Sequence, residues 1–116
     1  MPLDNSLRKR AEHNERFLET FSITHSPYLD WAVIVAFYTA VRYVDAYFYP
    51  QRPFDHGERL RWIEEDPRTR PIRREYRELY NESRGARYEL VTFTPAQVDR
   101  LLRNTLSRIK THMTRQ

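Results

Sequence analysis

Apolar residues recur every three or four positions along most of the chain, with charged residues between them. This spacing is typical of amphipathic helices, because residues three and four apart share one face of an α-helix. It predicts helices over residues 4–21, 27–49, 55–65, 68–84 and from 95 onward. A short segment at 88–93 has an extended pattern, but one strand makes no sheet. We therefore expect a single domain over residues 1–116 with an all-α fold, an antiparallel up-and-down bundle of four to five helices.

Local signals set the limits of these helices. Asp55 is a candidate N-cap for the third helix, since its side chain can accept from backbone N–H groups of the first turn. Thr94, Pro95 and Gln97 form the clearest start signal in the chain, a capping box with proline at the first helical position. Gly85 predicts the end of the fourth helix.

The most apolar stretch is WAVIVAFYTAV, at residues 31–41. A helix that is apolar nearly all round is enclosed by other helices, so this pattern predicts the central helix of the bundle. The stretch is too short for a membrane span, which needs about 20 residues. Arg42 and Asp45 follow it closely, and each would be unfavourable inside a bilayer. We therefore expect no membrane association.

Composition removes several classes of function. The chain has no cysteine, which excludes disulfides, thiolate catalysis and cysteine-bound zinc. Its 2 glycines make a glycine-rich phosphate loop untenable. The 4 histidines do not have the spacing of a known metal motif, so neither a metal nor another cofactor is expected. The N-terminus lacks the apolar region of a secretory signal, which favours a cytoplasmic protein.

Positive charge suggests a nucleic-acid partner. The net charge is +4, the pI is about 9.6, and Arg outnumbers Lys by 18 to 2. Guanidinium groups suit phosphate contacts because they donate two parallel hydrogen bonds. The candidate nucleic-acid-binding residues in RTRPIRREYR are Arg68, Arg70, Arg73, Arg74 and Arg77. Acidic residues at 64–66, 78 and 82 can neutralise this patch, so an ion-paired surface is the alternative.

Polar residues near the end of the central helix form a second candidate. Arg42 and Asp45 lie three apart and can pair with each other, and His56 shares a helix face with Arg59. Neighbouring tyrosines suit a contact surface, because they combine an apolar ring with a polar tip. The candidate polar site or interface comprises Tyr38, Arg42, Asp45, His56, Arg59, Arg87 and Tyr88. The alternative is structural: His56 packs its helix onto the bundle, and the charges pair within it.

The order of these residues resembles small bacterial and archaeal HEPN-domain proteins. The resemblance covers about residues 28–112 and rests on Trp31, Phe37-Tyr38, the segment 41–46, His56, Arg59, Tyr76, Leu79, Ser83 and the ARY at 86–88. It implies a bundle of four or five helices that forms a homodimer. Many family members are ribonucleases of toxin–antitoxin or defence systems. Others bind nucleotides or are non-catalytic partners of nucleotidyltransferases, so RNA, a nucleotide, an antitoxin or a nucleotidyltransferase are the partners implied.

The family's catalytic signature is an arginine followed four to six residues later by a histidine, on the last long helix. Arg103-Asn104 matches its first two positions, but residues 108–110 are Arg, Ile and Lys. His112 comes nine residues after Arg103, on the opposite face of an ideal helix, whereas Arg108 and His112 share a face. The candidate catalytic residues are therefore Arg103, Asn104, Arg108, His112 and His56, without a matching signature.

We accordingly expect an RNA- or nucleotide-binding, or toxin–antitoxin or defence-associated, module that lacks the usual signature. One alternative is an active, metal-independent endoribonuclease that uses an off-pattern arginine and histidine. Another is a purely structural protein-interaction module.

Overall fold

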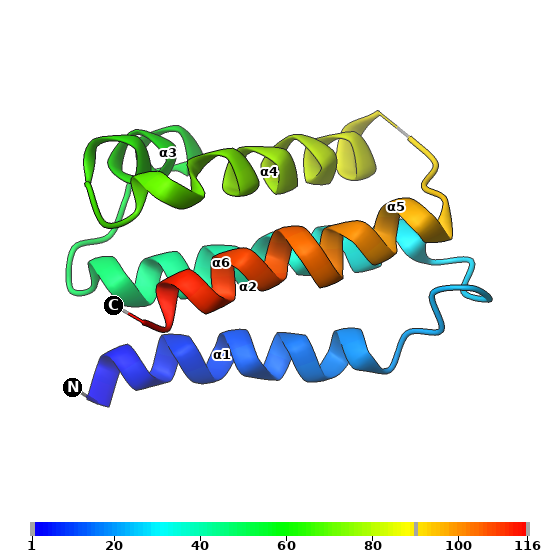
Figure 1. Cartoon of the computed structure of the whole chain (residues 1–116), viewed down its shortest axis with the longest axis horizontal. Coiled ribbons are helices and arrows are strands. Elements are labelled where there is room, and N and C mark those ends of the chain that lie inside the picture. The colour runs from blue at the N-terminus through cyan, green and yellow to red at the C-terminus, as the bar shows by residue number, and fades with distance from the viewer. Residues whose placement is uncertain (1, 90, 116) are drawn as a thin grey trace.

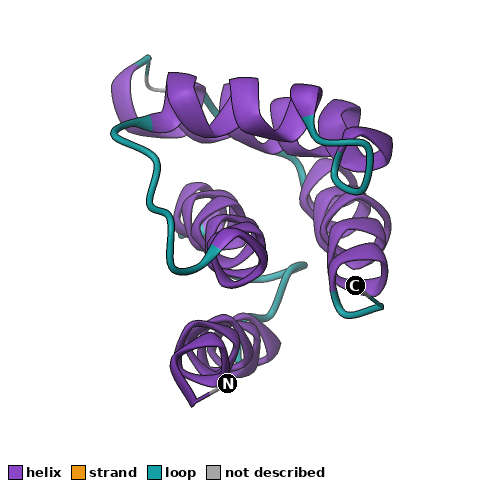
Figure 2. Ribbon diagram, turned by 90° about the vertical axis from the view of Figure 1, so that its left-hand side faces the viewer, coloured by secondary structure: helices purple, strands orange, loops and turns teal. Residues whose placement is uncertain are grey.

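The computed structural model describes residues 2–89 and 91–115, and the side chains from residue 6 onward. Every regular element in these ranges is a helix (Figure 2). The elements are α1 (Pro2–Glu19), α2 (Leu29–Phe48), α3 (His56–Glu65), the 3₁₀ turn η1 (Arg70–Ile72), α4 (Arg73–Tyr88), α5 (Pro95–Arg100), the π-helical turn η2 (Leu101–Leu106) and α6 (Ser107–Met113). The last three elements form one continuous rod. Because all the regular elements in the described ranges are helices, the predicted all-α bundle is confirmed.

The long helices alternate in direction. Helices α1 and α4 run one way, α2 and the α5–η2–α6 rod run the other way, and the two ends of the chain lie at the same end of the bundle (Figure 1). Helix α2 packs against α1, against α4 and against the rod. Among the described helices, only α2 has a backbone that lies close to the backbone of α1. The central place predicted for the apolar stretch is therefore confirmed.

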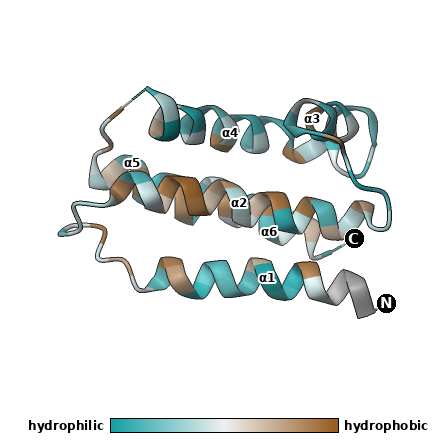
Figure 3. Ribbon diagram, turned by 180° about the vertical axis from the view of Figure 1, so that it is seen from behind, coloured by the Kyte–Doolittle hydropathy of each residue, from teal (hydrophilic) through white to brown (hydrophobic). Residues whose placement is uncertain are grey.

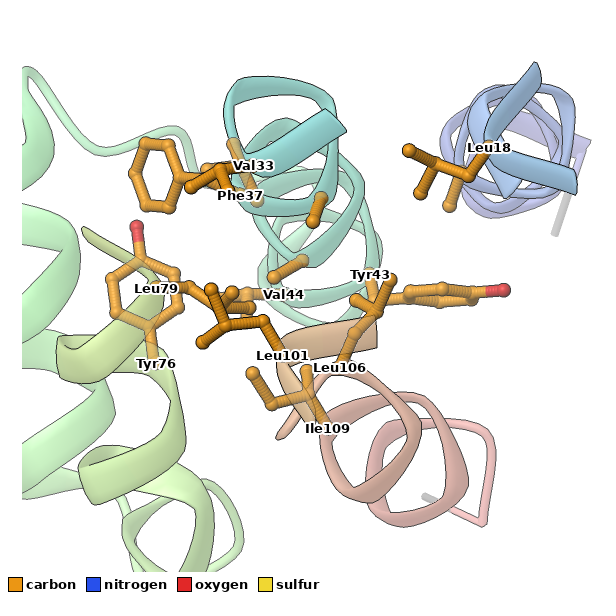
Figure 4. Close-up of a cluster of buried hydrophobic side chains, with 14 of the residues drawn as sticks. Leu18, Val33, Phe37, Tyr43, Val44, Tyr76, Leu79, Leu101, Leu106 and Ile109 are labelled. Carbon is orange, nitrogen blue, oxygen red and sulfur yellow. The ribbon is translucent and has the colours of Figure 1, made fainter. Parts of the chain in front are cut away.

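The core forms where α2 faces its neighbours. Phe37 and Val44 of α2 meet Tyr76 and Leu79 of α4, and the rod adds Leu101 and Ile109 (Figure 4). Apolar positions are dense in the middle layer formed by α2 and the rod (Figure 3). Trp31 is an exception to the predicted burial of this stretch, because 55% of it is exposed.

Two predicted helix starts are confirmed. Asp55 caps α3, with its Oδ1 accepting from the backbone N–H of Glu58 at 2.8 Å. Thr94 and Gln97 form the reciprocal capping box at the start of α5, with bonds of 3.2 and 2.8 Å. Each pair satisfies backbone donors that a helix start leaves without partners.

The predicted stop at Gly85 is wrong. Helix α4 continues to Tyr88, and Gly85 is buried within it. A Cβ atom at this position would lie 3.3 Å from Cγ2 of Val91. Gly85 thus lets the chain after α4 fold back closely over the helix, and its carbonyl accepts from the backbone N–H of Val91 at 3.4 Å. Residues 91–93 have no regular structure, so the extended pattern there forms no strand.

The π-helical turn lies in a part of the rod where the buried positions are four residues apart. Leu101, Thr105, Ile109 and Met113 are buried and lie at four-residue steps. An α-helix has 3.6 residues per turn, so each four-residue step drifts around the helix by about 40°. A π turn holds more residues per turn, which offsets part of this drift. The buried row therefore stays on the inner side of the rod, toward α2 and α4.

No helix in the described part of the chain combines the length and the apolar character needed to cross a membrane.

Candidate functional site

The predicted polar residues meet where α2, α3 and α4 converge. The guanidinium of Arg59 binds Asp45 through two hydrogen bonds, Nε to Oδ1 at 2.8 Å and Nη2 to Oδ2 at 3.2 Å. Arg59 Nη1 also lies 2.9 Å from Nδ1 of His56. Burial opposes the charge of Arg59, but the bonds to Asp45, together with the nearby Tyr76, outweigh this and raise the pKa of Arg59. The ion pair therefore stays charged and links α2 to α3.

The geometry fixes the protonation of His56. Since a guanidinium can only donate, Nδ1 must accept, and a neutral ring then carries its proton on Nε2. Burial lowers the pKa of His56, and the cations Arg59 and Arg87 lower it further. His56 is therefore neutral at physiological pH, as an acceptor for Arg59.

Aromatic rings surround His56. Its ring centroid lies 5.2 Å from that of Phe37, 5.7 Å from that of Tyr80 and 6.2 Å from that of Tyr38. Arg87 donates to the hydroxyl of Tyr38 at 3.0 Å and lies 5.1 Å over the ring of Tyr88. We call Tyr38, Asp45, His56, Arg59 and Arg87, with these rings, the α2–α4 cluster.

The structure thus joins all but one of the predicted polar-site residues. The exception is Arg42: Asp45 pairs with Arg59 instead, and the Arg42 side chain makes no ion pair with any described residue. Phe37 and Tyr80 belong to the cluster although their sequence pattern predicted only core packing. Tyr80 lies seven residues before Arg87, on one face of α4, and this spacing is the signal that could have identified it. Members of the cluster bind one another, so its evident effect is to hold three helices together.

The predicted catalytic residues of the last helix line a shallow groove of about 330 Å³, which we call the basic groove. Its lining residues are Arg103, Asn104, Ser107, Arg108, Thr111, His112 and Arg115. Every one of these side chains can donate a hydrogen bond, and none carries a carboxylate. A surface of this chemistry favours an anionic ligand.

Arg103 and His112 face different neighbours of the rod: Arg103 also lines the groove beside α1, whereas His112 lies at the Arg68 carbonyl before α4. Both line the basic groove. Arg103 lies within the π turn, whereas the expectation of opposite faces was based on an ideal α-helix. A π turn rotates less per residue, so nine residues carry the chain less far around the axis. His56, the remaining catalytic candidate, belongs to the α2–α4 cluster and not to this groove.

Residues of the basic groove already have partners. Arg103 pairs with Asp99 at 2.7 Å, and Arg108 lies 3.5 Å from Glu75. Both arginines are more than two-thirds exposed, and the pair between Arg103 and the half-exposed Asp99 contributes little free energy, so a phosphate can displace that carboxylate. His112 Nε2 lies within hydrogen-bond distance of the carbonyl of Arg68 and therefore donates to it, which places a ring proton on Nε2.

Arginines of the patch at 68–77 bind backbone carbonyls and a carboxylate of neighbouring residues. Arg70 donates to the carbonyls of Glu64 and Glu65, at 2.9 and 3.3 Å, at the end of α3. Arg77 forms an ion pair with Glu64. Arg73 donates to the Arg70 carbonyl, while Arg74 and Arg77 line a shallow hollow together with Glu78 and Glu82. Unlike the basic groove, this surface carries mixed charge.

A larger groove, of about 540 Å³, lies between α1 and the rod. Leu18, Phe21 and Leu102 contribute to its apolar lining. An ion pair between Lys110 and Glu15, at 2.8 Å, joins its two walls. Arg103 lines both grooves, so they adjoin along the rod.

Within the described ranges, no group of three or more His, Asp or Glu side chains is placed to hold a metal ion.

Comparison with known proteins adds no relative: no family model, curated protein or solved structure matches the chain. The function must therefore be argued from the side chains themselves.

Proposed function

We propose that this chain is an RNA-binding helical module that holds the phosphate backbone in the basic groove. The observation that supports this most is the chemistry of the groove lining, with three arginines, a histidine and three neutral donors, and without an acidic side chain. Phosphate contacts of this kind bind nucleic acid without regard to sequence.

The resemblance to HEPN-domain proteins supports RNA over other polyanions. The family's signature lies on the last long helix, and the basic groove lies on that helix here. From the same resemblance we propose a cytoplasmic homodimer, associated with a toxin–antitoxin or defence system and paired with an antitoxin or a nucleotidyltransferase.

A ribonuclease is the second candidate, and one observation favours it. Arg103, Asn104, Arg108 and His112 line a single groove despite their off-pattern spacing. In such a site an arginine would hold the scissile phosphate while the histidine moves a proton. For that role His112 would have to exchange its bond to the Arg68 carbonyl for one to the substrate.

The binding proposal is tested by titrating a short, fluorescein-labelled single-stranded RNA with the protein at several NaCl concentrations. The variant Arg115→Ala should weaken binding and reduce the slope of log K against log[NaCl] by about one, as expected for one lost phosphate contact. The matched control is Arg16→Ala, an exposed arginine on α1, which should change neither quantity. Salt-independent binding, or no binding by the wild-type protein, would contradict the proposal.

Cleavage is tested separately on the same RNA. A ribonuclease should lose activity in His112→Ala and retain it in His13→Ala, an exposed histidine on α1. Intact RNA after prolonged incubation with wild-type protein that binds it would leave a binding module and remove the enzyme.

A further inference from the structure

The π turn η2 is fixed to α4 by a buried side chain. The hydroxyl of Thr105, which is only 3% exposed, donates to Oε1 of Glu78 at 2.9 Å. The other oxygen of Glu78 pairs with Arg100, one residue before the turn, at 2.8 Å. Partial burial disfavours the carboxylate, but the bonds from Arg100 and Thr105 outweigh it and lower the pKa of Glu78. One carboxylate thus binds the start and the interior of the same turn.

π turns are rare and lie frequently at functional sites, so a π turn that is held in this way points to a function. An ordinary α-helix has the better geometry, and a departure from it persists only where its surroundings hold it. Glu78 supplies that hold from a neighbouring helix, at two points of the turn.

The turn contributes Arg103 and Asn104 to the lining of the basic groove. The lining residues form two rows at four-residue steps, one with Arg103, Ser107, Thr111 and Arg115 and the other with Asn104, Arg108 and His112. In an α-helix three such steps would drift around the axis by about 120°, and Arg103 would leave the face that Arg115 occupies. The π turn lies at the start of both rows and offsets part of this drift.

We propose that Thr105, Glu78 and Arg100 are positioning residues for the basic groove: they hold the π turn, and the π turn brings Arg103 and Asn104 into one groove with Arg108, His112 and Arg115. This inference rests on the proposed RNA-binding function. It adds that the RNA backbone contacts lining residues along the whole groove. Residues outside the groove then determine how many phosphate contacts form.

The test uses the full chain with Thr105→Val, which keeps the shape of the side chain but removes the hydroxyl. Without its bond to Glu78 the turn relaxes toward an α-helix, and Arg103 moves out of the groove. RNA binding should weaken roughly fivefold, and the salt slope should fall by about one although no charge has been removed. Thr105→Ser retains the hydroxyl and should restore both quantities.

The matched control is Thr39→Val. Thr39 is also buried, and its hydroxyl donates to the Val35 carbonyl within α2 at 2.7 Å. This variant should lose stability but keep the affinity and salt slope of the wild type. Wild-type RNA binding by Thr105→Val, or an equal loss in Thr39→Val, would overturn the positioning role alone. A wild-type protein that binds no RNA would overturn the proposed function, and the positioning role with it.

Discussion

At the scale of single residues, His56 shows how a half-buried polar side chain is fixed by its neighbours. It faces Arg59 on its own helix, Asp55 at the cap of that helix, Asp45 on α2 and Arg87 on α4. The neutral ring accepts a hydrogen bond from Arg59, and a protonated ring could not. Protonation would also place a third cation beside two guanidinium groups. The cluster therefore favours the neutral form.

This leads to a prediction for the pH dependence of stability. The pKa of His56 is lowered below the 6.5 of an unfolded chain, so the unfolded state takes up the proton first as the pH falls. The contribution of neutral His56 to the free energy of unfolding is fully present above pH 6.5. It is lost as the pH falls from 6.5 through the pKa of His56 in the folded state. Urea unfolding at a series of pH values measures this loss.

The variant His56→Gln should remove that part of the pH dependence, since glutamine accepts from Arg59 but does not titrate in this range. The control is His13→Gln, which replaces an exposed histidine on α1 and should leave the pH profile unchanged. An unaltered acid-side slope in His56→Gln would show that other groups govern it.

At the scale of elements, the start of the last helix is specified by its own sequence, whereas its π turn depends on neighbouring helices. Thr94 and Gln97 form the capping box with residues of the helix alone, so the sequence pattern was sufficient to predict it. The π turn depends on Glu78, a residue of another helix, and on packing against α2. Helical spacing within the segment therefore could not reveal it.

Loss of the cap should lower stability measurably. The variant Thr94→Ala leaves the backbone N–H of Gln97 without its acceptor and should reduce the free energy of unfolding by about 1 kcal/mol. Urea denaturation followed by circular dichroism measures the change. Thr20→Ala is the control: this exposed threonine donates to a carbonyl of the preceding helix and caps no N-terminus, so it should change stability much less. Equal losses in the two variants would argue against the cap.

At the scale of the whole molecule, the carboxylate of Glu15 joins α1 to two other helices, in addition to the apolar contacts between α1 and α2. Glu15 accepts from the hydroxyl of Tyr43 on α2 at 3.0 Å and pairs with Lys110 on α6 at 2.8 Å. Burial and the nearby charge of Glu15 raise the pKa of Tyr43, which keeps its hydroxyl protonated as a donor. Side chains of α1, α2 and α6 thus meet at Glu15.

A double-mutant cycle tests this junction. The variant Glu15→Ala leaves the hydroxyl of the nearly buried Tyr43 without its acceptor and should lower the free energy of unfolding by about 1–2 kcal/mol. In the Tyr43→Phe background, where no hydroxyl needs a partner, the same substitution should be less destabilising. Additive losses would mean that the two side chains do not cooperate.

The sequence by itself determined the helices, their order and the identity of the central helix. These features depend on apolar spacing, caps and prolines, which act within a few residues of one another. The wrong prediction that the fourth helix ends at Gly85 has a physical cause. Gly85 was interpreted as a local stop, but its position serves a contact with Val91 that only the folded chain makes. The resemblance to HEPN-domain proteins, and the RNA ligand that follows from it, remain predictions.

Only the tertiary structure decided which polar residues work together. Asp45 had two arginines within reach in the sequence, and the approach of α3 to α2 selected Arg59 over Arg42. The basic groove likewise depends on a π turn that Glu78 holds from α4. Hydrogen bonds and ion pairs require distances near 3 Å, and between helices those distances are set by packing rather than by position along the chain.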